Sequence, residues 1–465
     1  LRYGTAGNNN AGFGSGALQN TAGSNNTGIG YLALNANTSG TNNVAVGANA
    51  LDANTTGGSN VSIGYNSLTT NTTGPLNVAV GDNVLRDNTT GANNTAVGGH
   101  SMIKNQTGIE NVAIGTSAFE DNISGDSNVA VGRSALANNT TANANTAVGR
   151  ASSQANTTGH SNVSIGYQSN KLNQTGEKTT VIGYDALGNG GTNVNGIVAI
   201  GYNACKNTTN GGNTAVGYKA MENNTGGYWN TAVGIAALAS NTTNTHNTAF
   251  GYRALTAATS SFNDAFGFQA LVSLTTGRDN TALGISSGAN ISTGIDNVCI
   301  GSGAGSQLTS HQRNVAIGRE ALQRFKSHRN IAIGRQAMRG VTDQSTGTNN
   351  VMIGNQSGEV LTTGDNNVAV GQDTLKANTS ASNNTAIGKS ALEANTTGGV
   401  NTAVGRQALL ANTTGENNTS IGNSALYAVT TGNRNTGLGT HAGENITTGS
   451  NNICVGYNSD ASSAT

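Results

Sequence analysis

The pentad NVAVG at residues 43–47 returns as NVSIG at residues 60–64 and again as NVAVG at residues 77–81. Its closing glycine recurs 27 times between Gly14 and Gly456, and 20 of the 26 intervals are 17 residues long. A short fixed period is the signature of a solenoid, in which each coil buries its apolar face on its neighbours. We therefore predict an all-β parallel β-solenoid of about 27 coils, forming one continuous rod over residues 1–465, a fragment of a longer fibre.

The recurring glycine is taken as position 0 of each coil. Two slips of the period stand out, an 18-residue interval after Gly183 and a 20-residue interval after Gly334. We expect any function beyond a scaffold near these slips. The repeat glycines of the most regular stretch are Gly47, Gly64, Gly81, Gly98, Gly115 and Gly132.

The residues around the glycine predict two short strands per coil. Positions −3 and −1 are mostly β-branched, as in Val44 and Val46, and should share one strand face that points into the coil. Position −2 is almost always small, which suggests that another chain covers the opposite face. Ala and Leu at positions +3 and +4, as in Ala50 and Leu51, should form the second strand, before an Asn-Thr-Thr-Gly turn.

Asparagine stands at position −4 in 25 of the 27 coils. Stacking the coils would align these amides about 4.8 Å apart, so that each can hydrogen-bond to its neighbours above and below. A glycan-binding row is the alternative interpretation. The predicted structural ladder comprises Asn43, Asn60, Asn77, Asn94, Asn111 and Asn128.

A volume exchange within the repeat indicates a shared core. Four coils replace leucine at position +4 by glycine, and the same four replace asparagine at position +7 by Ile or Leu. The interior would stay filled by this exchange. The cysteines Cys205, Cys299 and Cys454 occupy repeat positions that are otherwise apolar or small, which predicts buried structural thiols.

Composition excludes several functional classes. Charged residues make up 9% of the chain and the net charge is zero, which argues against binding to nucleic acid or to an anionic membrane. No apolar run approaches the roughly 20 residues of a membrane span. The six histidines lie at different phases of the repeat without a recurring carboxylate, so we expect no enzyme, no cofactor and no metal site.

Two sets of residues are candidates for surface contacts. The residue after the glycine is aromatic in a run of coils, which suggests a stripe that either packs a corner or binds sugars: Tyr167, Tyr184, Tyr202, Tyr218, Tyr252 and Phe268. A basic segment near the second slip is either a solvated face, an inter-chain contact or a site for acidic polysaccharide: Arg319, Arg324, Lys326, Arg329 and Arg335.

The NVAVG pentad at residues 43–47 and NTAVG at residues 401–405 resemble the head repeats of YadA-like trimeric autotransporter adhesins. They look still more like the NTAIG-type arrays of bacterial surface anchor proteins and phage tail fibres. The resemblance covers essentially the whole chain and implies a left-handed parallel β-roll, wound as a homotrimer, without enzyme activity. The period departs from the pattern, since the adhesin heads repeat in about fourteen or fifteen residues.

These observations favour a structural or adhesive extracellular fibre or filament at a bacterial cell surface or on a virion. Its expected partners are further copies of itself, as a trimer or joined end to end, and possible surface glycans or a host receptor. The shaft of a phage tail fibre is the first alternative. Ice binding is an alternative of another class, and it requires an outward Thr-X-Thr pair on one strand.

Overall fold

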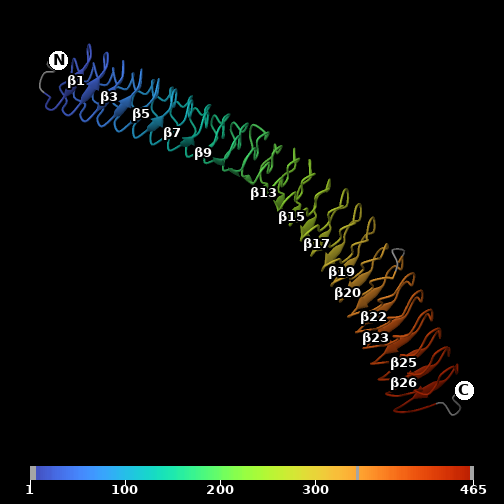
Figure 1. Cartoon of the computed structure of the whole chain (residues 1–465). Coiled ribbons are helices and arrows are strands. Elements are labelled where there is room, and N and C mark those ends of the chain that lie inside the picture. Colours follow the sequence, from blue (N-terminus) through green and yellow to red (C-terminus); the bar gives the residue numbers. More distant parts are fainter. Residues whose placement is uncertain (1–6, 342–344, 461–465) are drawn as a thin grey trace. The chain divides into compact units, whose positions relative to one another are not determined.

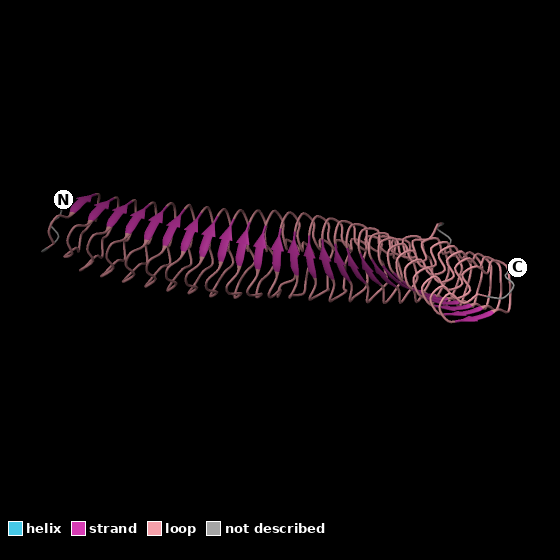
Figure 2. Cartoon of the chain, turned by 90° about the horizontal axis from the view of Figure 1, so that it is seen from below, coloured by secondary structure: helices cyan, strands magenta, loops and turns pink. Residues whose placement is uncertain are grey.

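The computed structural model describes residues 7–341 and 345–460. The chain divides into two compact units, residues 1–230 and 231–465, which run from blue to green and from green to red in Figure 1. Every regular element among the described residues is a three-residue strand, and Figure 2 shows that they all belong to repeated coils. The predicted all-β parallel β-solenoid with 17-residue spacing is confirmed, whereas the single continuous rod stays a prediction.

Within each unit, every strand pairs in parallel with the strand of the next coil, and equivalent residues lie side by side, as Val44 does with Val61. The strands of the first unit are β1 (Ala11–Phe13), β2 (Thr27–Ile29), β3 (Val44–Val46), β4 (Val61–Ile63), β5 (Val78–Val80), β6 (Thr95–Val97), β7 (Val112–Ile114), β8 (Val129–Val131), β9 (Thr146–Val148), β10 (Val163–Ile165), β11 (Thr180–Ile182), β12 (Val198–Ile200) and β13 (Thr214–Val216).

The second unit repeats this arrangement. Its strands are β14 (Thr231–Val233), β15 (Thr248–Phe250), β16 (Asp264–Phe266), β17 (Thr281–Leu283), β18 (Val298–Ile300), β19 (Val315–Ile317), β20 (Ile331–Ile333), β21 (Val351–Ile353), β22 (Val368–Val370), β23 (Thr385–Ile387), β24 (Thr402–Val404), β25 (Thr419–Ile421), β26 (Thr436–Leu438) and β27 (Ile453–Val455). No helix that could cross a membrane occurs among residues 7–341 and 345–460.

The prediction of a second strand at positions +3 and +4 is wrong. The residues at positions +2 and +4 have left-handed backbones, with φ of 58° at Asn49 and 51° at Leu51, so this wall of the coil cannot be extended. It is nevertheless tied to both neighbouring coils: Asn49 N donates to Tyr31 O at 2.8 Å, and Leu51 N donates to Ser67 O at 3.0 Å. A turn with left-handed backbone angles at positions +2 and +4 therefore replaces the expected strand.

The predicted orientation of the strand is also wrong. Position −2 is the inward one: Ala45 and Ala79 are fully buried, while the flanking residues of the same strands are only half-buried. The coil is narrow there, because Ser62 Oγ reaches the carbonyl of Ser67 on the opposite wall at 2.8 Å. Larger residues also fit in some coils: Val181 and Met352 are fully buried at this position, and Met352 lies beside Gly358, which stands in place of leucine. The restriction to small residues thus comes from the chain's own second wall, and the β-branched residues face outward.

The repeat glycine lies where two neighbouring coils approach each other closely. Gly98 has a φ of +116°, and a Cβ placed on it would lie 2.8 Å from the carbonyl carbon of Gly115 in the next coil. L-residues rarely adopt this backbone conformation, and real Cβ contacts are not this short. The recurrence of glycine therefore follows from both the backbone angle and the coil spacing.

The leucines at position +4 form the central row of the core, together with the small residues at −2 and +3. The predicted volume exchange is present in the four coils that have glycine in place of this leucine. A Cβ on Gly305 would lie 2.9 Å from Leu308 Cδ1, so the side chain from position +7 occupies the space. The four exchanged residues are fully buried: Ile291, Leu308, Leu361 and Ile446.

Candidate functional site

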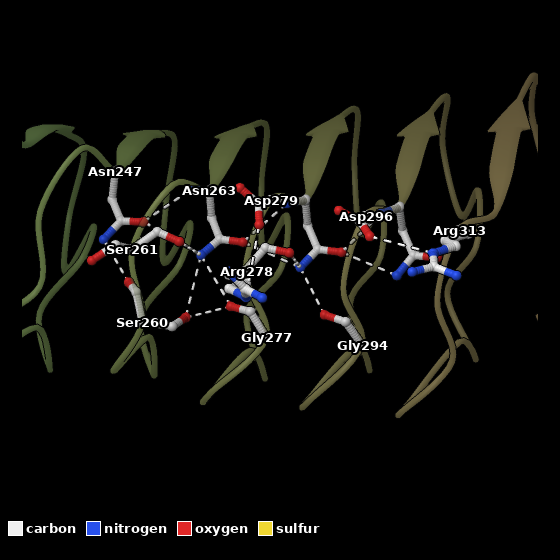
Figure 3. Close-up of polar contacts among 12 residues, drawn as sticks. Asn247, Ser260, Ser261, Asn263, Gly277, Arg278, Asp279, Gly294, Asp296 and Arg313 are labelled. Atoms are coloured by element: carbon white, nitrogen blue, oxygen red, sulfur yellow. Dashed lines mark hydrogen bonds and ion pairs between the residues drawn. The ribbon is translucent and has the colours of Figure 1, made fainter.

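The asparagines at position −4 line the interior and bond from coil to coil. Asn94 N donates to Asn77 Oδ1 at 3.0 Å, and Asn94 Nδ2 donates to Gly108 O at 2.8 Å. The same pattern recurs in the second unit, where Figure 3 shows Asn247 and Asn263 with the carbonyls that their amides reach. The ladder therefore joins side chains mainly to backbone groups. All six predicted members are buried, so none can bind a glycan: Asn43, Asn60, Asn77, Asn94, Asn111 and Asn128.

A second buried asparagine ladder lies at position +7 and was not predicted. Asn54 Nδ2 donates to Asn37 Oδ1 at 2.9 Å and to Gly57 O at 3.0 Å. The threonine that follows it also serves the interior, since Thr55 Oγ1 donates to Thr72 O at 2.9 Å. The regular recurrence of Asn-Thr-Thr-Gly was the available signal, although its sequence suggested only a turn.

A third row of contacts lies at position −6, on the outside of the coil. There a side-chain acceptor takes the backbone N–H of the preceding coil, although the residue type varies from coil to coil. Ile109 N donates to Asp126 Oδ1 at 2.8 Å, Asp126 N to Asn143 Oδ1 at 2.7 Å, and Asn143 N to His160 Nδ1 at 3.0 Å. This polar row satisfies backbone groups that the strands do not reach.

A polar exchange in the core lies in the regular coil that precedes the slip after Gly183. Thr179 stands where asparagine is usual, and Asn170 stands at position +4 in place of leucine. Asn170 Nδ2 donates to Thr179 Oγ1 at 3.2 Å, and Thr179 Oγ1 donates to Asn162 Oδ1 at 2.7 Å. The two departures from the repeat, Asn170 and Thr179, therefore compensate each other within the core.

The three cysteines are buried and free, as predicted. Burial raises the pKa of Cys205 and of Cys299 to about 12, and burial also raises the pKa of Cys454. Since the thiolate is the reactive form, none of them resembles a catalytic nucleophile.

We expect iodoacetamide at pH 8 to leave Cys205 and Cys299 unlabelled in the folded chain and to label all three cysteines in guanidinium chloride. Cys454 serves as the internal comparison and should label first, because β27 pairs only with β26 in the described part of the chain. Peptide mass spectrometry after timed labelling measures the three rates. Rapid labelling of Cys299 in the folded chain would contradict the interior location of position −2.

The predicted aromatic stripe forms two columns, one in each unit. In the first unit the rings of Tyr167, Tyr184, Tyr202 and Tyr218 stack in sequence, with centroids 5.1–5.3 Å apart. The Arg150 guanidinium lies 5.7 Å from the first ring, and Lys219 Nζ lies 5.6 Å from the last. In the second unit Tyr252 stacks on Phe268 at 5.1 Å.

This stacking limits what the columns can bind. A sugar ring stacks on the flat face of an aromatic ring, but Tyr184 and Tyr202 each have a neighbouring ring on both faces. Their edges and hydroxyl groups remain available. The columns are therefore better suited to stiffening the outer corner than to serving as a sugar platform.

The five predicted basic residues do not form one patch. Arg319 and Arg335 share position +1, while Arg324, Lys326 and Arg329 stand at positions +6, +8 and −5. Arg319 is paired with Glu320 at 2.8 Å, and Arg324 Nη1 donates to Val341 O at 2.9 Å. The segment 342–344 of the second slip lies outside the described residues.

One basic residue of this set lies in a hollow of the surface. Gln312, His328, Arg329, Thr348 and Asn349 line a cavity of about 200 Å³ in the second unit. A second hollow, of about 430 Å³, lies further along the same unit. Six of its lining residues stand at the same coil positions, −6 and −5, and two threonines stand at position −8: Thr414, Glu416, Asn417, Thr431, Asn433, Arg434, Ser450 and Asn451. We call the first of these the corner pocket.

The most extensive exposed feature is the outer face of the strands, which we call the strand strip: the side chains at positions −3 and −1. In the described strands only Asp264 carries a charge at these positions, and none has threonine at both. Ice binding therefore lacks the outward Thr-X-Thr pair that it requires. Before the terminal strand β27, whose Ile453 and Val455 are 77% and 62% exposed, the exposed large apolar members in the second unit are 36–48% exposed: Phe250, Phe266, Leu283, Val368, Val370, Ile387, Ile421 and Leu438.

No constellation suited to catalysis lies among residues 7–341 and 345–460, and no three metal-binding side chains converge there. His441 Nδ1 lies 2.7 Å from Glu444, and His311 lies 4.8 Å from His328 between ring centroids. Comparison of the chain with protein-family models, with curated proteins and with solved structures gives no match. The proposed function therefore rests on the structure of the coil and on its exposed surfaces.

Proposed function

We propose that the chain is a structural and adhesive component of an extracellular fibre, on a bacterial cell surface or a virion, without enzymatic activity. The observation that carries this proposal is the strand strip. It is a long row of half-exposed β-branched and aromatic side chains, interrupted by a single charge at Asp264. Soluble monomers rarely expose a contiguous apolar surface of this extent.

Another copy of the same chain is the partner that fits the strand strip best. Its side chains repeat with the coil spacing of about 4.8 Å, and an identical chain has the same spacing along its whole length. Rows of side chains can then interdigitate over many coils, whereas an unrelated partner would fall out of register. We propose lateral packing of three copies, the number that the resemblance to trimeric adhesins implies.

The interior suits a load-bearing role. The two asparagine ladders and the strand pairing link each coil only to its neighbours, so force along the coil axis is shared by many equivalent hydrogen bonds. Stability is then close to a sum over coils. A chain of this kind can hold a binding surface at a distance from the cell.

Replacing Leu283 by serine is expected to weaken self-association at least tenfold, because one half-exposed leucine loses about 1.5 kcal/mol or more of burial energy in each contact. Sedimentation velocity over a concentration series measures the association constant. Val400→Ser is the matched control, because Val400 is 55% exposed at position −5, away from the strand strip, where other coils carry serine. A parent chain that stays monomeric at every concentration contradicts lateral packing.

A further inference from the structure

We propose that the corner pocket binds the carboxylate of an acidic saccharide, with Arg329 as the principal contact. This inference deepens the adhesive part of the proposed function and rests on it, but it does not require lateral association. The pocket is built by three consecutive coils of the second unit: Gln312, His328 and Thr348 stand at position −6, and Arg329 and Asn349 stand at position −5.

Among the five residues that line the pocket, Arg329 carries the positive charge and no carboxylate is present. The nearby arginines Arg313 and Arg339 are paired with Asp296 and Glu359, at 3.7 and 3.1 Å. Arg329 is exposed and takes part in no ion pair among residues 7–341 and 345–460. An arginine left free in a hollow can hold a carboxylate through two parallel hydrogen bonds.

The hydrogen bonds between residues at position −6 orient a second donor of the pocket, the His328 ring. Gln312 N donates to His328 Nδ1 at 3.1 Å, so the proton of the neutral His328 ring lies on Nε2. This N–H is then the free donor of the ring. The adjacent ring of His311, 4.8 Å away between centroids, has its pKa lowered by burial, by His328 and by Lys326, in that order.

The acid nearest to the pocket is already engaged. Asp365 Oδ1 accepts both the backbone N–H of Thr348 at 2.6 Å and its hydroxyl at 3.0 Å. These two hydrogen bonds hold the carboxylate against Thr348 at the edge of the pocket, and Asp365 itself is not among the residues that line it. The side-chain amides of Gln312 and Asn349 add neutral hydrogen-bond donors and acceptors. Both kinds of group can hydrogen-bond to the hydroxyl groups of a sugar.

The volume and composition together select the ligand class. A hollow of about 200 Å³ has room for one sugar unit, and a set of arginine, imidazole, amide and hydroxyl groups matches a ring that carries a carboxylate and several hydroxyls. The second hollow, mostly at the same coil positions, contains both Glu416 and Arg434 and has no excess charge. We therefore assign the acidic sugar to the corner pocket.

Binding of a hexuronate tetrasaccharide to the full chain, measured by isothermal titration calorimetry at low salt, tests the assignment. Arg329→Gln should weaken it at least tenfold. Arg335→Gln is the matched control, because it removes the same charge from an exposed arginine at position +1 and should change the affinity less than twofold. The neutral hexose tetrasaccharide of the same linkage should bind at least tenfold more weakly to the parent chain.

Three results would overturn the proposal: no binding of the hexuronate, equal losses for Arg329→Gln and Arg335→Gln, or equal affinity for the neutral saccharide. Equal losses would indicate diffuse attraction to net charge, which salt would also abolish. Thermal unfolding of each variant shows whether the coil is intact. Sedimentation velocity of the same samples without saccharide shows whether the chains still associate. A loss of saccharide binding can then be distinguished from a failure of lateral packing.

Discussion

Replacing Gly98 by alanine is expected to lower the free energy of unfolding of the first unit by about 2–4 kcal/mol. The new Cβ would lie 2.8 Å from the carbonyl carbon of Gly115 and 3.2 Å from its Cα, both backbone atoms that cannot move aside alone. It would also force an L-residue to a φ of +116°. Strain of this kind costs about 1–3 kcal/mol by itself, and the clash adds to it.

The chain offers a control one residue away. A Cβ on Gly99 would meet only Asp82 O, at 3.9 Å, so Gly99→Ala should change the free energy of unfolding by no more than about 0.5 kcal/mol. Guanidinium titration followed by circular dichroism measures both variants against the parent chain. If the two alanines are equally tolerated, the close approach of the coils at position 0 is not what maintains the repeat glycine.

Replacing Asn94 by alanine is the second large effect, with an expected loss of about 2–5 kcal/mol. Asn94 Nδ2 donates to Gly108 O at 2.8 Å, and Asn94 Oδ1 accepts Asn111 N at 3.0 Å. Removing the amide leaves the buried N–H of Asn111 without its acceptor, which costs about 1–3 kcal/mol. It also removes one of the two donors to Gly108 O, where Asn105 Nδ2 remains at 3.2 Å, and this lost hydrogen bond adds about 0.5–1.5 kcal/mol.

Asn93→Ser is the matched control for this substitution. Asn93 is exposed at position −5, and serine stands at that position in other coils, such as Ser59 and Ser127. We expect a change within about 0.5 kcal/mol in the same titration. Hydrogen exchange gives a second readout, since the amide of Asn111 should lose protection in Asn94→Ala. Retained protection at Asn111 would mean that water or another group replaces the ladder.

The sequence alone was sufficient for the period, the parallel β-solenoid and the interior asparagines. Identical residues at one phase, such as Asn94 and Asn111, must occupy identical environments, and a buried amide is satisfied most simply by its own repeat. The exchange of Gly305 with Leu308 was also predictable, because a lost side-chain volume in a narrow core has to be replaced nearby.

Which face of the strand points inward could not be settled by the pattern. A strand has a period of two, so small residues at −2 and β-branched residues at −3 and −1 fit either orientation. Which face points inward depends on the width of the coil, and the left-handed backbone at Leu51 sets that width. The row at position −6 escaped notice for another reason, because Asp126, Asn143 and His160 share only the ability to accept a hydrogen bond.

The corner pocket was predicted only in part. Arg329 belonged to a basic cluster in the sequence, but its neighbours in the sequence lie at other coil positions. Its partners in the pocket come from the preceding and following coils, and the 16- and 20-residue intervals around them obscure the shared phase of Gln312, His328 and Thr348. Alignment by the repeat glycine, rather than by residue number, is what brings them together.

The bonds of the two asparagine ladders reach only one coil away in either direction. Removing or adding one whole coil would therefore let the residues on either side meet the same partners as before, without repacking the rest. The number of coils thus sets the length of the molecule, while the stability that each coil contributes stays the same. Duplication or deletion of one repeat within the gene would lengthen or shorten the protein by one coil. The length of the coil array is therefore the property that selection can adjust most freely.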